Sequence, residues 1–210
     1  MNLKESLIFE LKGYIGRKFF DNKPPIDGLE KKLLHLGCGE KRFNDWINAD
    51  FFVGLKPWKK HLRPDWMFDL RYPLNCDNEV WDGIFSEHLI EHLSFSEVTQ
   101  LVKELFRTMK YGAWLRITVP DLRKYVEFYL GNSVDKQFSQ FATGCDAIDS
   151  LTHNFDHHST WDANQLKIFL DRAGFRNISE VNFMEGSDGR LLKDGIERRW
   201  ETLYMEAQKV

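Results

Sequence analysis

Two glycines and one acidic residue are the first residues whose types and spacing indicate a binding site. Gly37 and Gly39 directly follow the apolar run Lys32–Leu36, and Asp50 ends the next apolar segment, Trp46–Asp50. In an open α/β sheet, ligands bind beyond the carboxyl ends of the strands, and glycines let the backbone approach them. A carboxylate at the tip of the neighbouring strand accepts hydrogen bonds from a ribose diol. The spacing therefore predicts a site for a nucleoside-containing cofactor.

The residues around this turn do not fit a dinucleotide. The dinucleotide fingerprint needs a third glycine or alanine, and an acid about 20 residues further on. Here Arg42 occupies the third position, and Asp50 comes too early. Glu40 directly follows Gly39 and would repel a pyrophosphate. A cofactor that carries a positive sulfonium and no phosphate would not be repelled.

The glycine turn and a later block resemble the class I S-adenosyl-L-methionine (SAM)-dependent methyltransferases. The turn resembles their motif I, hydrophobic-D/N-hydrophobic-G-x-G, with His35 at the usual Asp or Asn position. The block Trp81–Asp121 resembles their run from the fourth to the fifth strand. The resemblance extends over about Lys32 to Lys209 and is strongest to small predicted methyltransferases of the methyltransferase-11-like type. It implies an α/β, Rossmann-like fold with a mostly parallel seven-stranded sheet and an antiparallel last strand.

The resemblance also implies roles for individual residues. In this family the glycine turn lies against the methionine end of SAM, the acid after the second strand holds the ribose, and the third strand ends at the adenine. The residues that border the sulfonium follow the fourth strand. The cofactor-binding residues expected here are Gly37, Cys38, Gly39, Asp50, Phe51, Asp69, Leu70, Glu87 and His88.

Methyl transfer from SAM to a hydroxyl needs a residue that accepts the hydroxyl proton. Eight ionisable residues follow predicted strand ends: His88, Glu91, His92, Asp121, His153, Asp156, His157 and His158. Of these, we predict His88, Asp121 and His157 as catalytic residues.

The segment His88-x-x-Glu91-His92 has two metal-binding interpretations. It matches the H-x-x-E-H pattern of zinc hydrolases, in which both histidines lie on one helix. Some class I O-methyltransferases carry E-x-x-E-H here, which binds a divalent ion together with a late histidine, and Asp156-His157-His158 could supply that histidine. Because His88 replaces the first glutamate of that pattern, we predict no metal ligand and expect His92 to cap or pack the turn. A divalent ion remains the second hypothesis.

The positions of predicted helices and strands are consistent with this arrangement. Residues 1–25 predict an amphipathic helix and a Pro24-Pro25 linker, and residues 26–210 form the methyltransferase domain. The crossover between the first two strands is too short for a full helix, so we expect the N-terminal helix to cover the sheet face left bare. Its apolar face could alternatively contact a partner protein or a membrane surface.

The later elements are predicted from periodicity and caps. Ser94-Phe95-Ser96-Glu97 is a capping box that starts a helix ending at Tyr111-Gly112. We expect a third strand over Trp66–Leu70, and an irregular, polar segment over Phe52–Asp65 and again over Gly131–Asn154. Further helices are predicted over Leu122–Leu130 and before Gly174, and the last two strands over Asn177–Phe183 and Thr202–Ala207.

Composition limits the function classes. The chain has 210 residues, which suits one domain, and a formal net charge of -3, which argues against a nucleic-acid substrate. Its three cysteines are scattered, and no apolar run approaches the ~20 residues of a membrane span, so we expect a cytoplasmic protein. The basic loop around Lys59, the arginines near Arg198 and the residues Trp58, Trp66, Trp161 and Trp200 could meet a saccharide or small anionic acceptor.

The function predicted from the sequence is SAM-dependent O-methylation of a small molecule or saccharide. Two alternatives remain open. One is a non-catalytic module with the same fold, held to a partner enzyme by its N-terminal helix. The other is a metal-assisted 2′-O-type methyltransferase that acts on a nucleic acid or a diol.

Overall fold

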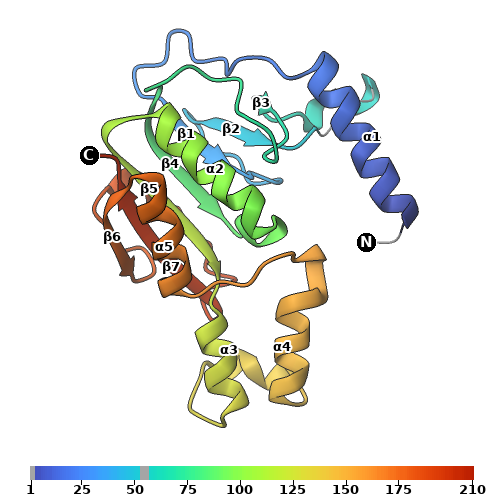
Figure 1. Ribbon diagram of the computed structural model, residues 1–210, viewed down its shortest axis with the longest axis vertical. Helices are drawn as coiled ribbons and strands as arrows, with labels where there is room; N and C mark the ends of the chain where they lie inside the picture. The colour runs from blue at the N-terminus through green and yellow to red at the C-terminus, as the bar shows by residue number, and fades with distance from the viewer. Residues whose placement is uncertain (1–2, 53–56) are drawn as a thin grey trace.

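The apolar run after the linker forms β1, an interior strand of one seven-stranded sheet (Figure 1). The computed structural model describes residues 3–52 and 57–210. The strand order is β3-β2-β1-β4-β5-β7-β6, and β7 runs antiparallel to both neighbours while the other pairs are parallel. The predicted α/β fold with an antiparallel last strand is therefore confirmed. The strands are β1 (Leu33–Leu36), β2 (Ile47–Asp50), β3 (Trp66–Met67), β4 (Trp81–Glu87), β5 (Met109–Pro120), β6 (Arg176–Val181) and β7 (Thr202–Gln208).

One face of the sheet is covered by α2 (Phe95–Thr108) and α5 (Ala163–Ala173), which lie side by side in Figure 1. The predicted capping box at Ser94 and Glu97 is present, with both of its reciprocal hydrogen bonds. The helix ends earlier than predicted, because Met109 pairs with Trp81 as the first residue of β5. The residues just before Gly112, which the sequence predicts as the end of the helix, therefore belong to β5.

The other face of the sheet is covered by loop residues. Leu33, Trp46 and Phe85 pack there with Leu191, which comes from the long connection between β6 and β7. Phe43, from the short segment between β1 and β2, packs against the same cluster. The prediction that the N-terminal helix covers this face is wrong, because the connection before β7 covers it instead.

The N-terminal helix α1 (Leu3–Phe19) lies beyond the carboxyl ends of β2 and β3 (Figure 1). It packs closely through Gly16, where an added Cβ would lie 2.1 Å from the Phe52 ring. Its apolar stripe points outward: Leu7, Leu11 and Phe19 are 63%, 59% and 65% exposed. The helix therefore turns most of its large apolar side chains outward, and it contacts the domain through Phe9, Gly16 and polar side chains.

A pair of helices, α3 (Leu122–Tyr129) and α4 (Gly144–His153), projects from the end of β5 (Figure 1). The prediction of an irregular segment over Gly131–Asn154 is wrong, because α4 lies within it. The Thr143 hydroxyl accepts a hydrogen bond from the Asp146 amide at 3.1 Å and caps this helix. Buried Ala147 and Leu151 attach it to the cluster around Tyr125 of α3.

Two more elements differ from the sequence prediction. Strand β3 is only two residues long, although the Phe68 amide still donates to the Asp50 carbonyl. Pro57–Leu62 forms a 3₁₀ helix in place of the expected irregular segment, and residues 53–56 of that segment lie outside the described residues. Within the described part of the chain, none of the helices has the length and apolar character that crossing a bilayer requires.

Candidate functional site

The glycine turn after β1 folds back onto the tip of β2. Gly37 and Gly39 have positive φ angles of 72° and 52°, which favour glycine. The Gly37 and Cys38 amides both donate to the Ala49 carbonyl, at 2.9 and 3.0 Å. The Asp50 carboxylate accepts hydrogen bonds from the amides of Gly39 and Phe51, each at 2.6 Å. The predicted pair of strand tips is therefore one hydrogen-bonded unit, and its carboxylate retains further acceptor capacity.

A cavity of about 540 Å³, here called the strand-end cavity, opens at these tips. Five of the predicted cofactor-binding residues line it: Gly37, Asp50, Phe51, Asp69 and Leu70. Its remaining walls come from α1, from the segment after β4, and from residues 155–158. Concave cavities of this size are typical of cofactor sites.

Helix α1 forms one wall of the strand-end cavity, a position that the sequence analysis does not predict. The Phe9 ring stacks on the Phe51 ring, with centroids 4.5 Å apart and planes 16° apart. Lys12 lies close enough to Asp50 to interact with its charge, while burial lowers the pKa of Lys12. The ribose side of the cavity therefore has a carboxylate on the sheet and a nearby cation on the helix.

Asp69 is buried and fully engaged. Its Oδ2 accepts hydrogen bonds from Arg17 of α1 at 2.5 Å and from Arg71 at 2.8 Å. Its Oδ1 accepts from the Arg71 amide at 3.2 Å and the Arg71 Nε at 2.9 Å. Arg71 also pairs with Glu10, so that α1 is ion-paired to the loop after β3. A ligand amino group could use the Asp69 carboxylate only if one of these donors moved away.

A smaller cavity of about 270 Å³, here called the Glu87 cavity, adjoins the strand-end cavity at Gly37. Cys38, Glu87 and His88 line it together with His35. The predicted cofactor-binding residues therefore divide between two cavities that share Gly37. Gly39 borders neither of them and acts through its hydrogen bond to Asp50.

Three polar groups of the Glu87 cavity, those of Glu87, Cys38 and His35, are already paired or neutral. Glu87 accepts hydrogen bonds from the Gly195 amide at 2.5 Å and from the Lys41 ammonium at 3.1 Å. Burial and the Asp50 charge raise the pKa of Cys38 to about 12, so its thiol stays protonated at neutral pH. Burial lowers the pKa of His35 to about 4, so this ring is neutral there.

His88 lies between Thr202 and Glu91. Its Nε2 is 2.8 Å from the Thr202 hydroxyl, and that hydroxyl donates to the Arg198 carbonyl at 2.6 Å. Because the hydroxyl hydrogen is used there, Nε2 must donate, which leaves Nδ1 with a lone pair in the neutral ring. Nδ1 lies 3.3 Å from the Glu91 Oε1.

The zinc-hydrolase interpretation needs His88 and His92 on one α-helix, and they are not. His88 has a left-handed φ of 47°, and only a single 3₁₀ turn, Ile90–His92, follows it. The two histidines therefore do not stand one helical turn apart on a common face.

Glu91, His92 and His157 nevertheless come together, with one ligand-type atom from each lying within 4.8 Å of the others. The Glu91 carbonyl accepts hydrogen bonds from the amides of His158 and Ser159, which attaches the late segment to this turn. The Glu91 side chain is buried, and neither of its oxygens makes a hydrogen bond with any residue that the structure describes. His92 is exposed, so it does not pack into the turn as predicted.

His157 is oriented by a backbone group. Its Nδ1 lies 2.7 Å from the Leu151 carbonyl, which can only accept, so Nδ1 carries the hydrogen. In the neutral ring Nε2 then holds a lone pair. Metal-binding histidines are usually oriented in this way, by a hydrogen bond from the ring nitrogen that does not bind the metal.

Asp121, the remaining predicted catalytic residue, begins α3. Its carboxylate accepts a hydrogen bond from the Arg123 amide at 3.0 Å, and burial raises its pKa. It does not line the strand-end cavity or the Glu87 cavity.

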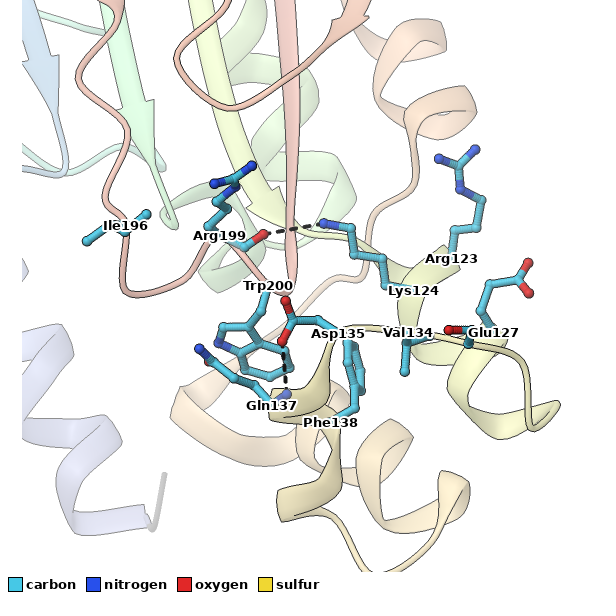
Figure 2. Close-up of a pocket in the computed structure, with 11 residues that line it drawn as sticks. Arg123, Lys124, Glu127, Val134, Asp135, Gln137, Phe138, Ile196, Arg199 and Trp200 are labelled. Atoms are coloured by element: carbon cyan, nitrogen blue, oxygen red, sulfur yellow. Dashed lines mark hydrogen bonds between the residues drawn. The ribbon is translucent and has the colours of Figure 1, made fainter.

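A third cavity, of about 710 Å³, lies between α3, residues 133–138 and the loop before β7 (Figure 2). Figure 2 shows Arg123 and Lys124 on one side and Trp200 beside Phe138 on the other. Lys124 donates to the Arg199 carbonyl at 3.5 Å, the upper dashed line in Figure 2. The loop over residues 195–200 borders both this cavity and the Glu87 cavity.

The four tryptophans that could contact a saccharide lie in different surroundings. Trp66 and Trp161 are buried in the main core. Trp200 lines the third cavity. The side chain of Trp58 lies outside the described residues.

No protein-family model matches the sequence, and no curated protein matches it either. Among solved structures, the chain is similar to a SAM-dependent methyltransferase from Archaeoglobus fulgidus, with a TM-score of 0.54, 18% identity, and 96% of this chain and 94% of that one covered. It is similar to a SAM-dependent methyltransferase from Thermotoga maritima, described as a possible histamine N-methyltransferase (TM-score 0.54, 15% identity, 99% and 93% covered). A SAM-dependent methyltransferase from Methanosarcina mazei is also similar, with a TM-score of 0.52, 16% identity, and 87% and 93% covered. At these identities the likeness establishes the fold.

Proposed function

We propose that this chain, whose fold is that of the class I SAM-dependent methyltransferases, binds SAM and transfers its methyl group to a hydroxyl of a small molecule or saccharide. The observation that carries the proposal is the pair of strand tips at Gly37 and Asp50, joined by hydrogen bonds at the floor of a cavity of about 540 Å³. Ligand sites of open α/β sheets lie beyond such strand ends.

The two cavities divide the cofactor between them in this proposal. The ribose diol donates to Asp50, and the adenine lies along Phe51 and Leu70 in the strand-end cavity. The methionine end passes Gly37 toward the Glu87 cavity, so the sulfonium lies near the residue that both cavities share. The carboxylate of Glu87 then attracts the positive cofactor.

The chain's own residues would contribute position and a base. Methyl transfer is an in-line displacement, so holding the acceptor against the methyl carbon supplies much of the rate. His88 is the predicted base that the geometry supports best. Its Nδ1 carries the lone pair but is buried, 3.3 Å from the Glu91 carboxylate, so the His88 ring must turn before Nδ1 can reach an acceptor hydroxyl in the Glu87 cavity. Glu91 would then stabilise the imidazolium that forms. His157 and Asp121 remain predictions.

The third cavity supports a saccharide or small anionic acceptor. Trp200 offers an aromatic surface at its edge, and the basic Arg123, Lys124 and Arg199 line it together with the acidic Glu127 and Asp135. Its loop continues into the Glu87 cavity, on the side where a methyl group would be presented. The net charge of -3 argues against a long nucleic-acid substrate.

Titration calorimetry with SAM, S-adenosylhomocysteine and NAD⁺ tests the cofactor. We expect the first two to bind and NAD⁺ not to bind, because Glu40 directly follows the glycine turn and would repel a pyrophosphate. Binding of NAD⁺ without SAM would contradict the proposal. Turnover is then measured as S-adenosylhomocysteine formed with a panel of saccharides and small hydroxylated acceptors.

The same measurements separate the enzyme from a non-catalytic module. A module held to a partner enzyme would form no S-adenosylhomocysteine with any acceptor, and a module that has lost the cofactor would also show no thermal shift with SAM. An enzyme would show both the shift and the product.

Metal assistance is the second candidate, and the cluster of Glu91, His92 and His157 favours it. The buried Glu91 oxygens lack hydrogen bonds to described residues. The hydrogen bond from His157 Nδ1 to the Leu151 carbonyl leaves a lone pair on His157 Nε2 that could bind a metal ion. These three side chains would hold the ion beside the strand-end cavity, which His92 lines. A divalent ion in such a site lowers the pKa of a bound hydroxyl and orients it.

Electron paramagnetic resonance with Mn²⁺ tests this site without using turnover. We expect wild-type protein to bind one Mn²⁺ and Glu91→Gln to bind it at least about tenfold more weakly, since a charged ligand is lost. His153→Asn is the matched control, because that histidine is exposed and pairs with Asp149 on α4. Equal Mn²⁺ affinity in Glu91→Gln and wild type, or no binding in either, would exclude the metal.

A further inference from the structure

The outward face of α1 is an apolar surface without a covering element in the described structure. Its large side chains project on one side of the helix, and Tyr72 beside it is also exposed. The opposite side of the helix carries Ser6, Phe9 and Glu10 into the strand-end cavity. We name the exposed side the α1 stripe; it comprises Leu7, Ile8, Leu11, Tyr14, Ile15 and Phe19.

Positive charge borders the α1 stripe at its carboxyl end. Lys18 is exposed there, with its ammonium 5.5 Å from the Phe19 ring. The 3₁₀ helix Pro57–Leu62 adds exposed Lys59 and Lys60. The Arg63 guanidinium lies 5.2 Å from the Phe20 ring, so this basic segment lies beside the end of α1.

The acidic side chains that the structure describes near α1 are paired, partly buried or turned toward the strand-end cavity, and Asp21, just after the helix, is only half-exposed. Glu10 faces the strand-end cavity and pairs with Arg71, and Asp69 is buried beneath Arg17 and Arg71. Asp65 accepts hydrogen bonds from both nitrogens of Asn48. The surface around the stripe is therefore apolar with a basic border.

We propose that the α1 stripe docks this protein on the surface of an anionic lipid bilayer, with α1 lying in the plane of the interface. A helix with one apolar face and flanking lysines binds in this way, through burial of the apolar side chains and attraction to anionic headgroups. A second copy of the chain fits less well, because its stripe has the same basic border, so Lys18, Lys59 and Lys60 would gain no opposite charge from it, whereas anionic headgroups supply one. Docking would also bring the strand-end cavity, of which α1 is a wall, to the lipid surface.

Co-sedimentation of the full chain with vesicles tests the proposal. Two vesicle types are used, phosphatidylcholine alone and phosphatidylcholine mixed with phosphatidylglycerol. We expect binding to the mixed vesicles only, and weaker binding as salt rises. Absence of binding to the mixed vesicles at low salt, or equal binding to both types, would overturn the proposal.

Variants separate the apolar and the charged contributions. Leu11→Glu and Phe19→Glu should each bind mixed vesicles at least about tenfold more weakly, since each loses an apolar side chain that the bilayer would bury. Lys59→Gln and Lys60→Gln should each cost about fivefold. The matched control is Leu130→Glu, which is 63% exposed at the end of α3 and should bind as wild type does.

Two further results decide the outcome. Far-UV circular dichroism should show unchanged helix content in Leu11→Glu and Phe19→Glu, because both side chains are exposed. Unchanged vesicle binding by both variants would overturn the proposal. A dimer in sedimentation velocity that Leu11→Glu dissociates, without vesicle binding by the wild type, would overturn it in favour of a second copy.

Discussion

The strand-end cavity has two walls that are built in different ways. The sheet wall, at Gly37 and Asp50, is held by short backbone hydrogen bonds between neighbouring strand tips. The α1 wall is held by side chains from distant parts of the chain, chiefly the Arg17–Asp69 ion pair and the stacking of Phe9 on Phe51. The sheet wall is therefore fixed by the fold, whereas the helical wall depends on a few contacts that can be exchanged. Four predictions test this difference.

The largest expected effect is on the sheet wall. Asp50→Ala should weaken SAM binding about a hundredfold, because it removes two charge-assisted hydrogen bonds to the ribose, each worth about 1.5–3 kcal/mol before compensation. Asp50→Asn keeps one acceptor oxygen for the Gly39 amide and should lose about tenfold. Calorimetry with SAM measures both. A change of less than about threefold in Asp50→Ala would mean that the ribose binds elsewhere.

The second prediction concerns the burial of His35, the β1 residue that lines the adjoining Glu87 cavity. Burial lowers the pKa of His35 to about 4, against 6.5 in an unfolded chain. The unfolded chain therefore takes up a proton as the pH falls below 6.5, whereas the folded chain stays neutral down to about 4. Stability is fully present above pH 6.5 and is lost as the pH falls, by about 2 kcal/mol between pH 7 and pH 5.

Urea unfolding at pH 7 and pH 5 measures this loss. His35→Leu should show a clearly smaller difference between the two pH values than the wild type does, because leucine binds no proton. Equal differences in the two proteins would show that His35 is charged, or exposed to solvent, in the folded state.

The third prediction concerns the packing of α1 against the domain. In Gly16→Ala the added Cβ would lie 2.1 Å from the Phe52 ring, so the helix must shift. We expect a destabilisation of about 1–2 kcal/mol, since overpacking costs more than the gain in helix propensity. Gly13→Ala is the matched control, because the atoms nearest its Cβ would be the ends of the Arg17, Asp69 and Arg71 side chains, at 3.1, 3.2 and 3.4 Å, and none of these belongs to a ring.

Thermal unfolding compares the two alanine variants. Gly13→Ala should stay within about 0.5 kcal/mol of wild type. If both variants match the wild type, α1 is not seated against Phe52 in solution, and the helical wall of the cavity is looser than the structure has it.

The same difference between the walls explains what the sequence could predict. The glycine turn and Asp50 can be predicted from the sequence because a strand, its turn and the next strand lie within about 20 residues, so neighbouring residue types determine them. The capping box at Ser94 is equally local. These features predict the sheet order once the resemblance to the methyltransferase family supplies the topology.

Contacts between distant segments could not be predicted in this way. No local pattern indicates that Arg17 meets Asp69, 52 positions later. That Glu91 meets His157 is expected only under the metal hypothesis, which comes from the family resemblance and not from the spacing of these residues. Glu91 and His157 are brought together by the amides of His158 and Ser159, which donate hydrogen bonds to the Glu91 carbonyl. Backbone hydrogen bonds of this kind leave no pattern in the sequence of side chains. Helix α4 was missed although Thr143 and Asp146 carry a capping signal, because the surrounding polar residues obscured it.

The smallest expected effect concerns the contact that joins the two walls. All acceptor positions of the buried Asp69 carboxylate are taken by Arg17 and Arg71, so an adenine amino group must displace a donor to reach it. Arg71 is held close by the chain, two residues away, and Arg17 is therefore the donor that leaves. Arg17→Gln should bind SAM about two- to fivefold more tightly, the equivalent of one partly exposed ion pair. Calorimetry with SAM measures this change, and Lys18→Gln, one residue along α1 and exposed, is the control. Weaker SAM binding by Arg17→Gln would instead mean that the ion pair holds α1 in place as a wall that the cofactor needs.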